Sequence, residues 1–157
     1  MRAHEMRIPV LLWMRLLTAL RRRGGGRSES GAFLLTKAGA SRVSRFICYD
    51  DLDPMALASG IVVFRGASFV PLWNFCQRNG MRVVADAHTH CGDWTGQSEA
   101  DRTNPMIGLP GHIALIVPHF AQCRWQTLDG VGIFEYLGDH EWRSWPARSS
   151  RVRISLI

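Results

Sequence analysis

The stretch Val83-Val84-Ala85-Asp86-Ala87-His88-Thr89-His90-Cys91-Gly92 carries most of the structural information in this sequence, because an apolar segment runs directly into two histidines. In an extended chain the side chains of residues i and i+2 project to the same face, so His88 and His90 can direct two imidazoles at one point. Asp101 follows eleven residues after His90. Two histidines and one carboxylate leave a fourth position open for water, as in catalytic rather than structural zinc sites. The stretch therefore predicts a strand that ends at a metal centre.

A hydrolytic metal centre also needs a general base. Zinc lowers the pKa of a bound water towards about 7, and a nearby carboxylate must take the proton of that water and pass it to the leaving amine. Glu29 is a candidate because it lies between the glycine-rich turn at 24–26 and the apolar segment Ala32 to Thr36. Spacing alone does not select it.

Three segments together resemble a known family. They are Glu29-Ser30-Gly31-Ala32-Phe33-Leu34-Leu35, His88-Thr89-His90 and, after seven intervening residues, Ser98-Glu99-Ala100-Asp101. In order and spacing they are similar to the JAB/MPN-type metalloproteases that carry the JAMM motif, the zinc isopeptidases that remove ubiquitin and ubiquitin-like proteins. The resemblance implies one α/β domain of the MPN/JAB-like (cytidine-deaminase-like) type over residues 1–157, with its core at about 8–137 and a mixed β-sheet flanked by helices.

The same resemblance implies a role for each matched residue. His88, His90 and Asp101 correspond to the ligands of one Zn²⁺ per chain. Glu29 corresponds to the general acid/base that acts through the zinc-bound water, and Ser98 to the hydroxyl that stabilises the oxyanion. The motif usually has proline after its second histidine, where this chain has Cys91. We expect this change to cost little activity. The sharper hypothesis is that Cys91, next to a zinc ligand, makes the enzyme sensitive to oxidation.

The implied activity is cleavage after the C-terminus of a ubiquitin-like protein, from a target amine or from a precursor extension. Residues 97–107 and 111–121 look most like the bacterial members found in ubiquitin-like conjugation operons. The partners of these bacterial members are the tail of the ubiquitin-like protein and the activating and conjugating enzymes of the same pathway. Some of these operons act in anti-phage defence. A non-catalytic MPN-type interaction scaffold is the alternative, because some relatives have lost the motif.

Several residues near the motif keep two interpretations. Ser98 and Asp101 also fit a helix capping box, which is compatible with a metal centre. Asp86 lies two residues before His88 and either orients that ligand or is a surface carboxylate at the end of a strand. His112 is expected in the core or on the surface rather than as a further ligand, and His119 likewise. Trp94 is either a packing aromatic or a substrate contact.

Length and composition limit the other possibilities. With 157 residues, of which 46% are apolar and 20% charged, the chain fits one globular domain. That is too short for a (β/α)8 barrel, which excludes the amidohydrolases that also carry a His-x-His pair. The net charge of +6 by itself speaks only to association. Because there is no recognised nucleic-acid motif, we expect no nucleic-acid partner.

Location follows from a few further features. Arg15 interrupts the apolar stretch near the N-terminus, so neither a signal peptide nor a membrane span is predicted and no membrane partner is expected. The four cysteines show no CxxC spacing, which indicates reduced thiols. We expect a cytoplasmic protein.

Periodicity predicts the secondary structure. A helix is expected from about residue 8 to 22, a second near Pro71 to Arg78 and a third starting near Ser98. The expected strands are Ala32 to Thr36, Val43 to Tyr49, Gly60 to Phe64, Met81 to Ala87, His112 to Val117, Ile133 to Tyr136 and Val152 to Ile154.

Overall fold

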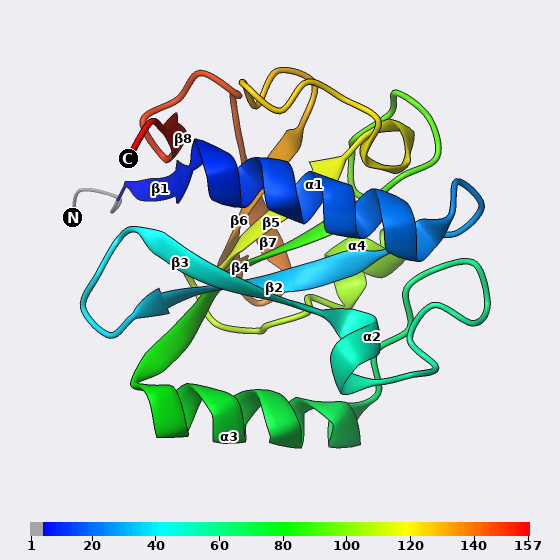
Figure 1. Ribbon diagram of the computed structural model, residues 1–157, viewed down its shortest axis with the longest axis horizontal. Coiled ribbons are helices and arrows are strands. Elements are labelled where there is room, and N and C mark those ends of the chain that lie inside the picture. Colours follow the sequence, from blue (N-terminus) through cyan, green and yellow to red (C-terminus); the bar gives the residue numbers. More distant parts are fainter. Residues whose placement is uncertain (1–4) are drawn as a thin grey trace.

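A central mixed sheet lies between two long helices (Figure 1). The computed structural model describes residues 5–157. The strands are β1 (Met6–Pro9), β2 (Gly31–Lys37), β3 (Val43–Cys48), β4 (Met81–Thr89), β5 (Ile113–Val117), β6 (Gly132–Gly138), β7 (Glu141–Trp145) and β8 (Val152–Ser155). The helices are α1 (Val10–Gly24), α2 (Tyr49–Leu52), α3 (Phe69–Asn79) and α4 (Glu99–Thr103), with 3₁₀ turns at Gly66–Ser68 and His119–Ala121.

Six strands form the main sheet in the order β3-β2-β4-β5-β6-β7. Only the β4–β5 pair within it is parallel, while its other pairs are antiparallel. β1 and β8 form a separate parallel pair. The prediction of an α/β domain with a mixed sheet flanked by helices is therefore confirmed.

Each face of the sheet packs against its own helix. On one face Trp13, Leu16 and Leu20 of α1 pack with Leu34 of β2 in one buried cluster. The alternate residues Phe33 and Leu35 of β2 turn to the other face and pack with Leu72 of α3. Residues 32–35 of β2 are therefore all apolar because this part of the strand is buried on both sides.

The beginning of the chain differs from the prediction. Residues 6–9 form β1, and the register Met6↔Val152 joins it to β8. Pro9, with ψ 135, is the N-cap of α1, so the helix begins at Val10 rather than at residue 8. Ile8 is buried in either case, which is why helical spacing included it.

The strand expected at Gly60 to Phe64 is wrong. This segment is irregular, and its backbone bonds locally, from Val63 N to Ala56 O and from Gly60 N to Leu57 O. Val62 and Phe64 pack against the cluster under α3, so their apolar character serves packing and not a strand ladder.

Two further elements differ from the prediction. Tyr49, expected as the end of a strand, instead begins α2. The edge strand β7 was not predicted.

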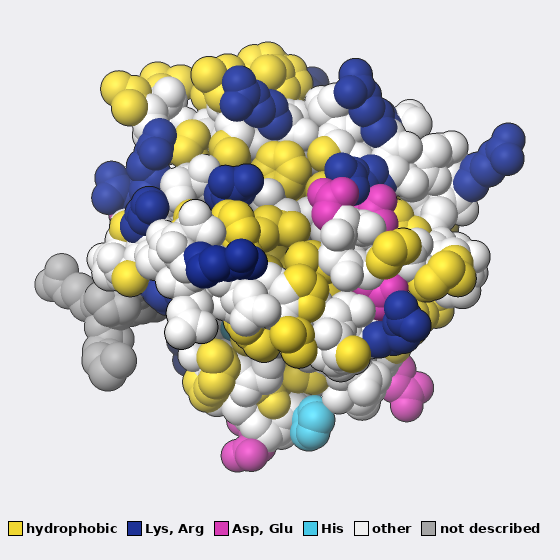
Figure 2. Space-filling view, turned by 60° about the horizontal axis from the view of Figure 1, so that its bottom comes forward, with side chains coloured by type: hydrophobic (Ala, Val, Ile, Leu, Met, Phe, Trp, Pro, Cys, Tyr) yellow, Lys and Arg dark blue, Asp and Glu magenta, His cyan; other side chains and the backbone are white. Residues whose placement is uncertain are grey.

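The surface adds two observations. Arg and Lys side chains are scattered between apolar ones on the face that carries α3, without forming one continuous stripe (Figure 2). Among residues 5–157, no helix has the length and apolar character needed to cross a bilayer.

The carboxyl end of β4 is the part of the fold that positions the motif. After β4 the chain follows β5, since His90 N bonds to Val117 O, and then forms a loop that returns in α4. This loop is fixed on β6, because Thr95 Oγ1 donates to Gly130 O and a Cβ on Gly132 would lie only 2.0 Å from Thr95 O. Glycine at 132 therefore permits a close backbone contact that holds the loop.

Candidate metal centre

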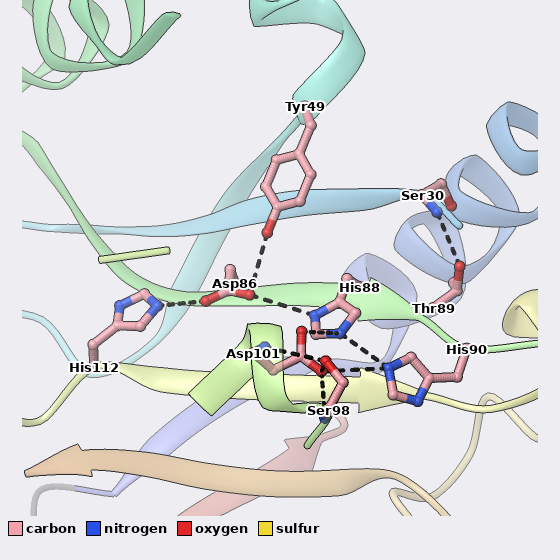
Figure 3. Close-up of polar contacts among 9 residues, drawn as sticks. All are labelled: Ser30, Tyr49, Asp86, His88, Thr89, His90, Ser98, Asp101 and His112. Carbon is pink, nitrogen blue, oxygen red and sulfur yellow. Dashed lines mark hydrogen bonds and ion pairs between the residues drawn. The ribbon is translucent and has the colours of Figure 1, made fainter. Parts of the chain in front are cut away.

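Three side chains converge at the end of β4: His88 from the strand, His90 just beyond it and Asp101 from α4 (Figure 3). Their ligand atoms all lie within 4.8 Å of one another. The two Nε2 atoms are 3.3 Å apart, His88 Nε2 lies 3.3 Å from Asp101 Oδ1, and His90 Nε2 lies 3.6 Å from Asp101 Oδ2. The structure therefore brings together the three ligands that the sequence predicts.

These separations suit a tetrahedral metal ion. Bonds of about 2.0–2.1 Å from zinc to nitrogen or oxygen at tetrahedral angles place neighbouring ligand atoms about 3.3–3.4 Å apart. The separations from His88 Nε2 to the other two ligands are both 3.3 Å. The group His88, His90 and Asp101 can thus hold one metal ion.

Ser98 fixes the carboxylate of Asp101. Ser98 is the N-cap of α4, where its Oγ accepts from Asp101 N at 3.1 Å. Its backbone N and its hydroxyl donate to Asp101 Oδ2 at 2.9 and 2.8 Å. The capping box expected from the sequence is confirmed, and it coexists with the metal ligand because Oδ1 stays directed at His88.

Charge at the centre favours a cation. Burial alone lowers the pKa of His88, but the hydrogen bonds and charges of Asp101 and Asp86 outweigh it and raise that pKa to about 10. Burial likewise opposes ionisation of Asp101, yet His88 and His90 hold its pKa well below the usual range. A metal ion held by these residues would take the place of the proton between the imidazoles and the carboxylate.

His90 is held by its own loop. Its Nδ1 lies 3.1 Å from the carbonyl oxygen of Trp94, and the two rings stack at 5.4 Å with an angle of 17° between their planes. The indole is 60% exposed. Trp94 is therefore not a core aromatic, and the face of its indole that stacks on His90 lies beside the metal group.

Glu29 lies at the same end of the sheet. It precedes Ser30, whose N donates to Thr89 Oγ1 and whose O accepts from Thr89 N, and Gly31 is paired with His88. Glu29 is half-buried, and its N donates to Gly60 O. Within residues 5–157 its carboxylate makes no hydrogen bond or ion pair, so its backbone is near the metal group while its side chain stays outside the bonded cluster.

Behind the metal group lies a buried polar cluster that the sequence indicated only in part. Asp86 and His112 are 3% and 5% exposed, and His112 Nε2 bonds to Asp86 Oδ1 at 2.6 Å. The Tyr49 hydroxyl donates to Asp86 Oδ2 at 3.2 Å (Figure 3). Burial opposes ionisation of Asp86, but His112 and His88 outweigh it and hold the pKa of Asp86 at about 2.

The prediction that left Asp86 as a possible surface carboxylate is wrong in that alternative, because Asp86 is buried. His112 is a core histidine, and His119 is exposed.

Gly31 makes room for that cluster. A Cβ at this position would lie 2.2 Å from Tyr49 Cε2 and 2.8 Å from Ala87 O. The Tyr49 ring therefore packs directly on the backbone of β2, from where its hydroxyl reaches Asp86.

Gly31→Ala is expected to destabilise the protein by roughly 1–3 kcal/mol, because the methyl group overpacks a buried contact between ring and backbone. Urea denaturation followed by circular dichroism measures this change. Gly66→Ala is the control, since a Cβ there meets nothing within 4 Å. Equal unfolding midpoints for the two variants would contradict the packing role of Gly31.

Comparison with known proteins supports the fold. No protein-family profile matches the chain. The solution structure of a protein from Desulfitobacterium hafniense matches with a TM-score of 0.65 at 13% identity, covering 96% of this chain and 92% of that one. A JAB1/MPN domain protein from Archaeoglobus fulgidus matches with a TM-score of 0.56 at 14% identity, covering 96% and 98%. A Salinibacter ruber protein matches at 0.54 and 16% identity, covering 90% and 89%. The protein thus has a JAB1/MPN-like fold.

Proposed function

We propose that this protein is a JAMM-type zinc metalloprotease that cleaves after the C-terminus of a ubiquitin-like protein. The observation that carries the proposal is the group His88, His90 and Asp101, whose ligand atoms have tetrahedral separations at a strand end of a JAB1/MPN-like fold. Zinc held there would polarise the scissile carbonyl and lower the pKa of a bound water towards about 7.

The chain's own residues would supply the proton transfers and the oxyanion contact. Glu29, beside the end of β4, would accept the proton of the attacking water and return it to the leaving amine. The Ser98 hydroxyl, which donates to Asp101 Oδ2 in this structure, would rotate to donate to the developing oxyanion. A donor of this kind contributes about 2.7–4 kcal/mol to transition-state stabilisation.

The substrate and setting are those that the sequence resemblance implies. An extended C-terminal tail would bind along a strand edge by β-augmentation, with small residues next to the metal. The bond cut is an isopeptide link to a target or a peptide link to a precursor extension. We place the enzyme in the cytoplasm, in a bacterial ubiquitin-like conjugation pathway with its activating and conjugating enzymes, including pathways of anti-phage defence.

A second candidate function is a non-catalytic interaction scaffold, because a JAB1/MPN-like fold by itself is compatible with either role. A scaffold would bind the ubiquitin-like partner without cutting it.

Metal removal tests the proposal. We expect purified protein to contain about one zinc per chain, to cleave a fusion carrying a ubiquitin-like C-terminal tail, to lose that activity on chelation and to regain it when zinc is returned. Zinc content is measured by plasma mass spectrometry and cleavage by gel electrophoresis. Bound zinc with partner binding but no cleavage would favour the scaffold, and failure to bind zinc even when it is supplied would reject the protease.

A further inference from the structure

The carboxylate of Asp86 has contacts on both of its oxygens. Oδ1 bonds to His112 Nε2, and Oδ2 accepts from the Tyr49 hydroxyl and lies 3.9 Å from His88 Nδ1 (Figure 3). Asp86 and His88 lie on the same face of β4, because they are two residues apart in a strand. The carboxylate therefore stands on the far side of the His88 ring from the metal group.

The surroundings of Asp86 are otherwise apolar. The register places Phe33 of β2 and Ala114 of β5 directly beside it, and the Phe33 ring packs on Tyr49 with centroids 4.8 Å apart. Burying a carboxylate here carries a desolvation cost that an apolar side chain would avoid, and buried ion pairs often add no net stability. A role in stability alone therefore does not account for Asp86.

Both histidine ligands share one arrangement. The Nδ1 of His90 lies at hydrogen-bond distance, 3.1 Å, from the carbonyl oxygen of Trp94, and the Nδ1 of His88 lies at ion-pair distance, 3.9 Å, from Asp86 Oδ2. The two Nε2 atoms face each other and Asp101. An acceptor at Nδ1 selects the tautomer that leaves Nε2 free for a metal and makes it a stronger ligand.

We propose that Asp86 is a positioning residue that orients His88 for metal binding, and that His112 and Tyr49 hold the Asp86 carboxylate in place. The inference rests on the proposed metal centre but not on protease activity. It assigns to the buried cluster an effect on metal affinity, exerted through the ring of His88.

Asp86→Asn tests this directly, because it keeps the size of the side chain and removes its charge. We expect Zn²⁺ affinity, measured by competition with a chromophoric chelator, to fall by about 10–100-fold. The visible absorption spectrum of the Co²⁺-loaded protein should change as well, since it reports the geometry of the ligands. His112→Gln, which leaves the carboxylate but removes its strongest contact, should give a smaller decrease.

Leu72→Ala is the control, because it weakens the core under α3 without touching the metal group. It should leave Zn²⁺ affinity and the Co²⁺ spectrum unchanged. A folded Asp86→Asn protein with wild-type Zn²⁺ affinity and Co²⁺ spectrum would overturn the inference and leave the proposed function standing. A loss of Zn²⁺ affinity in Leu72→Ala equal to that in Asp86→Asn would have the same meaning. A wild-type protein that binds neither ion would overturn both, whereas metal binding without cleavage would count against the proposed protease alone.

Discussion

Glu29→Gln is expected to lower kcat for cleavage of a tail fusion by roughly 10²–10⁴-fold while zinc content and substrate affinity stay unchanged. The amide keeps the shape of the side chain but cannot accept the proton of the attacking water. Because Glu29 makes no side-chain bond within the described chain, the substitution removes no structural contact, and the unfolding midpoint should not move.

The measurement is single-turnover cleavage alongside zinc content and thermal unfolding. Glu141→Gln is the matched control, since Glu141 is an exposed carboxylate on β7 and its replacement should leave the rate unchanged. Rapid cleavage by the Glu29 variant would show that another group serves as base.

Asp101→Ala should remove both bound zinc and cleavage, because it deletes the only carboxylate of the metal group and leaves two imidazoles 3.3 Å apart. His88→Ala should behave in the same way. Asp101→Ala also breaks the capping box, so a modest loss of stability, of about 1 kcal/mol, should accompany it.

Glu99→Gln separates these effects. Glu99 is an exposed carboxylate in the first turn of the same helix, and its neutralisation should change neither zinc content nor rate. Full zinc occupancy after dialysis of either ligand variant would show that the ligands are assigned wrongly.

Local patterns predicted the two parts of the metal group. The i, i+2 spacing of His88 and His90 fixes two ligands on one strand, and the capping spacing of Ser98 and Asp101 fixes the third at a helix start. Each of these spacings spans only a few residues, but the approach of Asp101 to the two histidines depends on the loop that packs against Gly130 and Gly132. The order of the two spacings along the chain, which resembles a family motif, joined them in the prediction. Glu29 came only from family resemblance, because its position depends on the pairing of β2 with β4.

The parts that sequence reasoning missed depend on long-range contacts. His112 meets Asp86 across 26 positions of sequence, through a parallel pairing that no local pattern reveals. The apolar residues at 60–64 looked like a strand because hydrophobicity does not distinguish packing under a helix from pairing in a sheet. The second half of β1 was absorbed into the predicted helix because Ile8 continues the apolar spacing of that helix.

The contact of Thr95 with Gly132 links the metal loop to a strand that begins 37 positions later. The final shape of the loop depends on this contact with β6, so the ligand group is complete only in the folded sheet. An ion that binds only this finished arrangement draws the whole folding equilibrium towards the native state. At a free zinc concentration 100 times the dissociation constant, that effect amounts to about 2.7 kcal/mol. The supply of metal in the cell would then set how long the protein survives as well as how fast it works.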